Sequence, residues 1–396
     1  MPVGTLFPPE KRTLRDEQTG RAVTQLTDSP AEDYHLYYYN PSITPDGKYL
    51  VFFSERTGLS NMFRLELESG EIVQLTDTRP VRAEYWPFSF NSLGAGACQS
   101  AIGSGGREVF YFEGTRLLAA NIYDLTQREV LVLPPDRRPS ILNADASGQT
   151  LVFATWDEAL FMQGSRRMKT ATDPLPEDDF FYQADTTIMR VDAGSGQAEE
   201  VLRLEKFWSN HVLVNPHNRD RLLFTHEFFD ATPERKRHDR MWLLNAATGQ
   251  AGPIPGQPPE EWFMHEFWSR DGQRVCFHGG RVAEQAAHGF CGWCTPDGAD
   301  YTKFHHRTTG RGYGHYNLHP DGGTMITDGE AAPGCLSRVR LADERQTFEV
   351  LCRHDSYKFV DDQRCHPHPS FSPDGKKVIF TSNRSGSSNI YMTDWE

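Results

Sequence analysis

Two histidines near the end of the chain have the types and spacing of metal ligands. His366 and His368 are separated by one residue, and Gln363 lies three residues ahead of His366. Successive side chains of a strand point to opposite faces, so residues two apart in a strand share a face. Imidazole nitrogens with one amide oxygen suit a borderline divalent ion such as manganese or zinc. The spacing therefore predicts a metal site on one strand face.

The histidine pair runs directly into a recurring hairpin signature. Residues 369–380 read Pro-Ser-Phe-Ser-Pro-Asp-Gly-Lys-Lys-Val-Ile-Phe, and residues 40–52 repeat this pattern almost residue for residue. Each copy is typical of two strands joined by a tight turn that contains Gly or Asn. Weaker copies lie at residues 143–153, 212–224, 265–277 and 315–326.

The repeats indicate a single all-β domain with the architecture of a β-propeller. Copies recur at roughly 40 to 55 residues, with little helical periodicity between them. Seven blades fit the 396 residues. Residues 22–28 repeat the outer-strand sequence of residues 71–77, so we expect them to complete the last blade and close the ring. The expected blades are residues 40–77, 107–133, 141–203, 211–255, 265–307, 315–353 and 366–396, and only the second lacks a turn signature.

Propeller geometry gathers the candidate residues at one end of the ring. The turns between first and second strands share one end, so residues before first strands and after second strands lie at the other. Eight of the fifteen histidines have such positions, and Arg240 opens a third strand at the same end. For each histidine alone a structural, hydrogen-bonded role is favoured, and only their convergence favours function. The eight are His35, His211, His226, His265, His278, His315, His366 and His368.

The composition favours a cytoplasmic protein that binds neither nucleic acid nor membrane. The net charge is −13, and no basic run carries interleaved aromatic residues. The first residues lack an apolar stretch of signal-peptide length, and no run approaches transmembrane length. Seven cysteines form no tight, even framework, which suits a reducing compartment. Cys291 and Cys294 have redox or zinc spacing, but without a second pair a structural role in a strand is favoured.

Over most of its length the chain resembles the oligogalacturonate lyase family, which has a seven-bladed propeller fold. The similarity is most specific at the Gln-x-x-His-x-His element, and it implies that Gln363, His366 and His368 are metal ligands. His315, within Gly-His-Tyr-Asn, matches a further histidine ligand. The resemblance implies Mn²⁺ as cofactor, with another divalent transition ion as the alternative.

The resemblance also implies catalytic residues. His265, within Met-His-Glu-Phe-Trp, matches the proposed general base of the family, and Arg240, within Asp-Arg-Met-Trp, matches its catalytic arginine. His226 and His35 lie at similar mouth positions and are expected to contact substrate. The implied reaction is β-elimination, which breaks the bond to O4 of a uronate after the C5 proton is removed. The unsaturated product can rearrange to a 4-deoxy-5-keto uronate.

The expected partners are short uronate oligosaccharides, with the protein acting as a monomer or homodimer. The aromatic residues before the first hairpin, and a stretch at 173–181 that resembles an inserted loop, favour short oligomers over a polymer. Two alternatives stay open at this point. One is a lyase acting on a different uronate, and the other is a propeller that serves only as an interaction scaffold, because the hairpin signature specifies fold and not activity.

Overall fold

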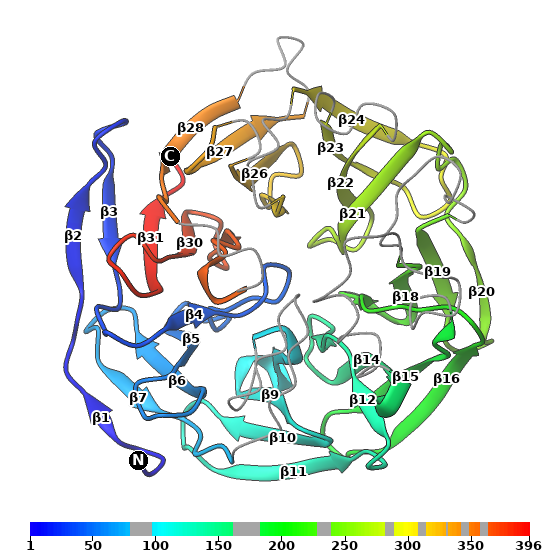
Figure 1. Cartoon of the computed structure of the whole chain (residues 1–396), viewed down its shortest axis with the longest axis horizontal. Helices are drawn as coiled ribbons and strands as arrows, with labels where there is room; N and C mark the ends of the chain where they lie inside the picture. Colours follow the sequence, from blue (N-terminus) through cyan, green and yellow to red (C-terminus); the bar gives the residue numbers. More distant parts are fainter. Residues whose placement is uncertain are drawn as a thin grey trace.

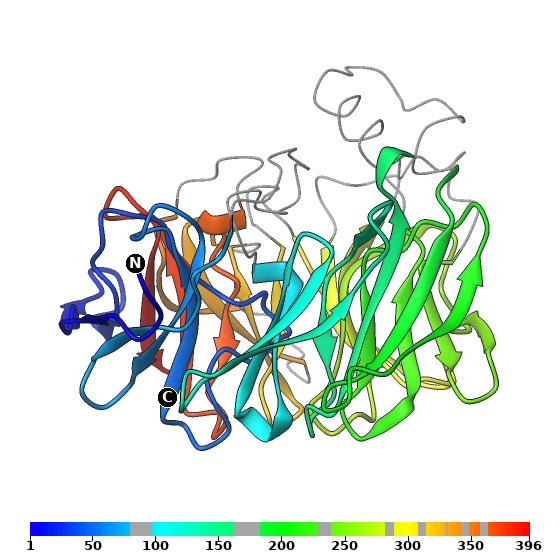
Figure 2. The same cartoon turned by 90° about the horizontal axis from the view of Figure 1, so that it is seen from below.

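The computed structural model contains seven antiparallel β-sheets arranged as blades around a central axis (Figure 1). Seen edge-on, the molecule is a flattened ring whose strands run between its two ends (Figure 2). The structure describes residues 1–79, 97–160, 183–227, 239–281, 289–307, 314–329, 332–341, 348–356 and 363–396. Within these residues, no helix is long and apolar enough to cross a membrane. The fold is the seven-bladed, all-β propeller that the repeats predict.

Each blade is one sheet. Its strands follow one another outward from the axis, except that strands from the N-terminal segment form the outer edge of the first and last blades. The first three blades contain β1 (Leu6–Phe7), β4 (Asp33–His35), β5 (Tyr49–Ser54), β6 (Asn61–Glu66) and β7 (Ile72–Gln74); β8 (Ser100–Gly103), β9 (Glu108–Glu113), β10 (Arg116–Asn121) and β11 (Gln127–Val132); and β12 (Arg137–Pro139), β13 (Asn143–Ala144), β14 (Thr150–Asp157), β15 (Thr186–Asp192) and β16 (Ala198–Leu204).

The fourth to sixth blades contain β17 (Val212–Asn215), β18 (Asn218–Thr225), β19 (Met241–Asn245) and β20 (Gln250–Pro253); β21 (Glu261–Trp268), β22 (Val275–Arg281), β23 (Gly289–Cys294) and β24 (Tyr301–His306); and β25 (Tyr316–Leu318), β26 (Thr324–Asp328), β27 (Cys335–Arg340) and β28 (Phe348–Arg353). The seventh contains β2 (Arg12–Arg15), β3 (Ala22–Gln25), β29 (Ser370–Phe371), β30 (Lys377–Ser382) and β31 (Asn389–Asp394). Short 3₁₀ turns are η1 (Ala97–Gln99), η2 (Ser104–Gly106) and η4 (Gln363–Cys365).

A repeated turn joins the inner two strands of most blades. In the first blade the amide of Gly47 donates to the carbonyl of Thr44 at 2.8 Å, and Gly47 has a φ of 72°. Asp46 accepts hydrogen bonds from Thr44 Oγ1 at 2.6 Å and from the amide of Lys48 at 3.0 Å. Glycine suits this position because it adopts a left-handed φ at no steric cost. The same glycine hydrogen bond recurs at Gly148, Gly272, Gly322 and Gly375.

Inner strands are buried on both faces because every blade lies between two others. All six residues of β5 are buried. Val51 packs in a cluster with Val109 of the second blade, whereas Phe52 packs with Ile390 of the seventh. Successive side chains therefore serve opposite blade interfaces, which explains why these strands read as continuous apolar runs.

The two ends of the chain close the ring. β3 pairs with β31, with Val23 opposite Thr393, as the sequence repeat predicts (Figure 1). Two outer strands were not predicted, since β2 pairs outside β3 and β1 pairs outside β7. β2 has the sequence Arg-Thr-Leu-Arg and is mostly exposed, so it carries no apolar pattern that could be recognised.

Four inner strands begin earlier than predicted. The third blade was expected from residue 141, but β12 starts at Arg137. The first blade was expected from residue 40, but its inner strand is β4, and Ile43 contributes only a single bridge to Leu50. The second was expected from residue 107, whereas β8 starts at Ser100. The fifth was expected from His265, but β21 starts four residues earlier, at Glu261, which places His265 inside a strand.

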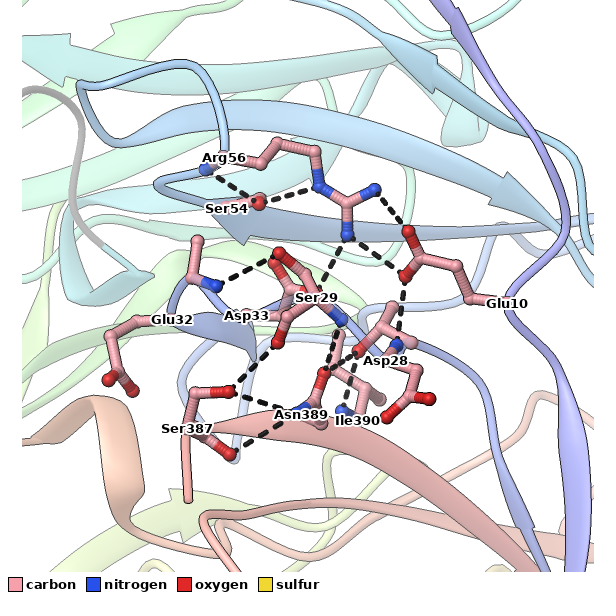
Figure 3. A network of polar contacts seen from close by, with 12 residues as sticks. Glu10, Asp28, Ser29, Glu32, Asp33, Ser54, Arg56, Ser387, Asn389 and Ile390 are labelled. Carbon is pink, nitrogen blue, oxygen red and sulfur yellow. Dashed lines mark hydrogen bonds and ion pairs between the residues drawn. The ribbon is translucent and has the colours of Figure 1, made fainter. Parts of the chain in front are cut away.

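A buried polar network joins the first and last blades beside the closing strand (Figure 3). Arg56 donates to both carboxylate oxygens of Glu10, at 3.0 and 3.2 Å, and to Asp33 Oδ2 at 2.8 Å. The amide of Asp33 donates to the carbonyl of Ser388 at 2.7 Å. Arg56 thus ties the N-terminal segment and the first blade to the loop that leads into β31.

Replacing Arg56 with methionine should lower the free energy of unfolding by about 3–5 kcal/mol, because Asp33 would keep a buried charge without its cation. The side chains of Arg56 and Asp33 are 6% and 0% exposed. The matched control is Arg12→Met, whose pair with Asp28 is 51% and 41% exposed. Exposed pairs of this kind contribute less than about 1 kcal/mol. Urea titrations compare the two variants, and equal losses would contradict the assignment.

Candidate metal centre and active site

Three of the predicted ligands converge at the axis. His315 directly precedes β25, whereas His366 and His368 lie between η4 and β29. Their ligand-capable nitrogens lie within 4.8 Å of one another, and all three residues are buried. The ring centroids of His315 and His368 are 4.2 Å apart, and that of His366 lies 5.5 and 5.6 Å from them. The grouping that the sequence predicts is therefore present.

The prediction that strand alternation brings His366 and His368 together is wrong. They are not strand neighbours, because the segment ahead of β29 is irregular and His368 has a left-handed φ of 46°. The intervening carbonyl of Pro367 instead accepts hydrogen bonds from the amide of Thr381 at 2.9 Å and from His35 Nε2 at 3.1 Å. The loop, rather than strand alternation, directs both imidazoles inward.

His35 supports this loop through a hydrogen bond to Pro367. It is 1% exposed. Its Nε2 donates to Pro367, and its Nδ1 lies 3.3 Å from Ser42 Oγ. Both ring nitrogens are thus engaged inside the protein, which does not favour the substrate contact expected from the sequence.

Asp328 orients the third histidine. It accepts a hydrogen bond from His315 Nδ1 at 2.7 Å and another from the His315 amide at 2.8 Å, and its side chain is 0% exposed. A carboxylate on one ring nitrogen fixes the tautomer and leaves the other nitrogen's lone pair for a metal. Sequence reasoning missed Asp328, although the pairing of Tyr316 with Thr327 sets these two residues opposite each other.

The donor set fits a divalent transition ion. His368 Nε2 is buried and has no hydrogen-bond partner among the described residues, which is costly unless another ligand is bound there. Three neutral imidazoles with a carboxylate behind one of them form a borderline-soft site. The backbone of Gln363 lies in η4, at the start of the same loop, but its side chain lies outside what the structure describes.

His265 lies beside the metal-type group, on a distortion of β21. The pairing of β21 with β22 shifts register between Met264 and Phe267, and His265 has a φ of 52°. Such a bulge re-aims a side chain. The His265 ring stacks on His315 with centroids 4.6 Å apart.

The hydrogen bonds of His265 leave one nitrogen as an acceptor. Nδ1 donates to the carbonyl of Gly314 at 2.7 Å, and His278 Nε2 lies 2.9 Å from the same nitrogen. Nε2 therefore carries the free lone pair of the neutral ring. Burial lowers the pKa of His265 to about 3, and the nearby charge of Arg240 acts in the same direction. His265 is neutral over the physiological range.

Arg240 is held by two buried carboxylates. Its Nε and Nη2 donate to Glu266 at 2.6 and 3.2 Å, and its Nη1 donates to Glu227 at 2.9 Å. Burial opposes the charge, but the two carboxylates outweigh it and raise the pKa of Arg240. Sequence reasoning missed both acids, although each follows a selected histidine, in His226-Glu227 and His265-Glu266.

His226 packs against an aromatic ring beside this network. Its ring stacks on Phe207 with centroids 3.7 Å apart and planes inclined by 14°. Its amide donates to the carbonyl of Arg240 at 2.8 Å. The structure therefore gives His226 a packing position, which does not favour the expected substrate contact.

Three consecutive tyrosines fill the axis beneath the histidines. Tyr37 lies 4.9 Å from His368, and Tyr38 lies 5.8 Å from His265, between ring centroids. On their other side, a cavity of about 340 Å³ extends toward the Asp-Gly turns, and its lining includes Tyr38, Tyr39 and Pro373. Tyr38 thus contacts both this cavity and the His265 ring. The predicted insertion at 173–181 lies outside the described residues.

The buried histidines should make the metal-free protein sensitive to acid. Burial lowers the pKa of His35 to about 4 and that of His354 to about 3, and it holds those of His315 and His368 well below the usual range. Below pH 6.5 the unfolded chain therefore binds more protons than the folded state, so stability falls as the pH decreases. At pH 5.5 each such histidine should cost about 1.4 kcal/mol.

Urea midpoints at pH 7.5 and 5.5, measured in chelator, test this expectation. Carboxylates with ordinary pKa values near 4 change little in that interval. Asp33 is the exception, because burial raises its pKa to about 6, and its proton uptake in the folded state partly offsets the loss. The variant His354→Gln should lose about 1.4 kcal/mol less than the parent between the two pH values. A midpoint that holds or rises on acidification would show that these histidines are not kept neutral by the fold.

Fold and site together define a β-propeller with a buried histidine centre and a clamped arginine at one end. The family model of oligogalacturonate lyase matches residues 166–395. Oligogalacturonate lyase of Dickeya dadantii (strain 3937) is 22% identical over 96% of this chain and 95% of its own length. Oligogalacturonide lyase of Pectobacterium atrosepticum is 23% identical over 99% and 98%. The chain belongs to the oligogalacturonate lyase family.

Solved structures agree with the fold. An oligogalacturonate lyase in complex with manganese superposes with a TM-score of 0.80 at 23% identity, over 100% of this chain and 98% of that chain. An oligogalacturonate lyase from Vibrio parahaemolyticus gives a TM-score of 0.81 at 22% identity, over 100% and 99%. Family membership favours an enzyme over the scaffold alternative.

Proposed function

We propose that this protein is a divalent-metal-dependent lyase that cleaves short oligogalacturonates by β-elimination. The observation that carries the proposal is the cluster of His315, His366 and His368, with His265 stacked on one of its members. Family membership supplies the substrate class. A lyase for another uronate is the second candidate.

His315, His366 and His368 would hold the ion, with Gln363 as a further ligand. When bound, a divalent ion such as Mn²⁺ neutralises the substrate carboxylate and stabilises the negative charge that develops beside it as the C5 proton leaves. Two observations support manganese, namely the similar oligogalacturonate lyase that was solved in complex with this metal and the imidazole donors of this chain.

His265 is the proposed general base. Its Nε2 is the free acceptor of a neutral ring, and a base must be unprotonated to take the proton from C5. Arg240 would stabilise the reacting uronate electrostatically, because a fixed guanidinium can face a carboxylate in two-pronged geometry. Of its five N–H donors, three bind Glu227 and Glu266, which leaves two for a ligand.

The product would be an unsaturated uronate that rearranges to a 4-deoxy-5-keto sugar acid. The buried Tyr37 and Tyr38 pack against His368 and His265, which supports short oligomers over a polymer that passes through the ring. We also propose a cytoplasmic location. All seven cysteines are free and buried in the structure, as suits a reducing compartment. A monomer or homodimer remains the expected assembly.

The decisive experiment uses protein that has been treated with a chelator and then dialysed. Incubation with digalacturonate, with and without added Mn²⁺, is followed by detection of unsaturated or keto uronate. We expect product only with the ion. Absence of product with any divalent ion, in protein that keeps its thermal midpoint, would contradict the proposal. Polymeric pectate should be cleaved much more slowly than digalacturonate, and equal rates would contradict the preference for short oligomers.

A further inference from the structure

Among the described residues, those around Arg240 form a buried ionic cluster with an unbalanced charge. Arg240 contributes one positive charge, whereas Glu227 and Glu266 contribute two negative charges. These side chains are 8%, 10% and 0% exposed. The pKa of Glu227 is held well below its usual range, because Arg240 and His211 outweigh the effect of burial. An uncompensated charge is costly inside a protein, so the cluster calls for one more positive charge.

His211 is the group positioned to supply that charge. It directly precedes β17, and its Nδ1 lies 2.8 Å from Glu227 Oε1. Its other nitrogen, Nε2, is buried and has no hydrogen-bond partner among the described residues. The residue is 7% exposed. With protons on both ring nitrogens, His211 would bring the net charge of the cluster to zero. The proton on Nε2 would point away from Glu227.

The imidazole of His211 lies at the same end of the propeller as His265. The His211 ring centroid lies 6.5 Å from that of His265. Arg240, on the far oxygen of Glu227, opposes a charge on His211, but Glu266 offsets that guanidinium. Within the described part of the chain, the other aromatic rings near the His211 imidazole are those of Tyr37 and Tyr39, at 6.2 and 6.3 Å between centroids.

The two facing imidazoles differ in the partner of Nδ1. His265 donates to the neutral carbonyl of Gly314, and its burial favours the uncharged ring. His211 Nδ1 instead lies 2.8 Å from a carboxylate oxygen of Glu227, which is an acceptor with a negative charge. Paired titratable groups in opposed environments mark an acceptor and a donor of protons. One imidazole is thus suited to take a proton and the other to give one.

We propose that His211 is a catalytic residue that donates a proton to the leaving oxygen, an inference that rests on the proposed lyase function. His265 Nε2 takes the C5 hydrogen as a proton, and that C–H electron pair becomes the C4–C5 double bond. The bond from C4 to the bridging oxygen breaks with its pair on oxygen, and His211 Nε2–H protonates that oxygen to a hydroxyl. In galacturonate the C5 hydrogen and the C4 oxygen lie on opposite ring faces, so two residues are required.

The test compares two substrates on one variant. His211→Asn keeps an amide near the Nδ1 position for Glu227 but removes the donor at Nε2. Digalacturonate has a poor leaving group that needs a proton, whereas a galacturonate with a 4-nitrophenoxy group at C4 does not. We expect His211→Asn, with Mn²⁺ present, to lower kcat on digalacturonate by about 10²–10⁴-fold. The loss on the nitrophenoxy substrate should stay below about 10-fold.

Equal losses on the two substrates would overturn the inference and assign His211 a positioning role, because poor folding or a displaced Arg240 lowers both rates alike. The comparison variant is His265→Gln, which should lose activity on both substrates because the C5 proton must be removed from each. A parent protein that cleaves neither substrate with Mn²⁺ would refute the lyase function itself. A parent that cleaves both while His211→Asn keeps full rates on both refutes only the role of His211.

Discussion

Replacement of His368 by alanine should remove bound metal and lyase activity together while leaving the propeller folded. His368 is one of three buried histidines whose ligand-capable nitrogens lie within 4.8 Å of one another. Residues behind a metal ligand already change affinity by about 10–100-fold, so loss of a ligand should exceed this range. The ring closes through β3 and β31 without metal, so the fold should persist. Metal content after dialysis and kcat/KM on digalacturonate measure the two effects.

Two further variants make this result specific. Asp328→Asn should weaken metal binding by about 10–100-fold without abolishing it, because Asp328 acts through His315. His319→Ala should leave metal and activity unchanged, since His319 contacts Gly375 in the turns at the other end of the ring. Retention of metal and rate in both His366→Ala and His368→Ala would end the ligand assignment.

Replacement of His265 by glutamine should abolish turnover with near-normal metal content. Loss of a general base typically lowers kcat by about 10²–10⁴-fold. In the parent protein, burial lowers the pKa of His265 to about 3, so the base should stay unprotonated and kcat should not fall between pH 7.5 and 5.5 on its account. Rates with saturating Mn²⁺ and metal analysis separate the base from the ligands.

His226→Gln is the matched control for the base, because His226 also precedes a buried glutamate but stacks on Phe207. It should retain most of the activity. Near-normal turnover in His265→Gln would transfer the role of base to another residue. A steep loss of rate in the parent at pH 6 would contradict a base that burial keeps neutral.

The repeated turns made the propeller predictable. A glycine with left-handed φ, two strands and an apolar run recur at Gly47, Gly272 and Gly375 in forms that a single sequence displays. Strands with exposed or mixed side chains were missed, as β1 and β2 show. The inner strand β4 was missed because it has only three residues and precedes the tyrosines that leave the sheet for the axis.

The histidines of the site were predictable, but their supporting acids were not. His315, His366 and His368 stand out by residue type and by their place before inner strands. Asp328 and Glu227 are ordinary acids until the fold sets each one beside a histidine, at 2.7 and 2.8 Å. The loop that turns His368 inward depends on contacts of Pro367 with residues far away in sequence, which no local pattern reveals.

The pairing of β3 with β31 also fixes when the protein can mature during translation. Strand β3 leaves the ribosome long before its partner, because Thr393 Oγ1 bonds the carbonyl of Ala22 across 371 residues. Until residue 394 has emerged, the first and sixth blades both present uncovered sheet faces. Long-range closure of this kind is slow and exposes apolar surface. Nascent chains stalled before β31 should therefore be targets for chaperones and proteases, whereas the closed ring should resist both.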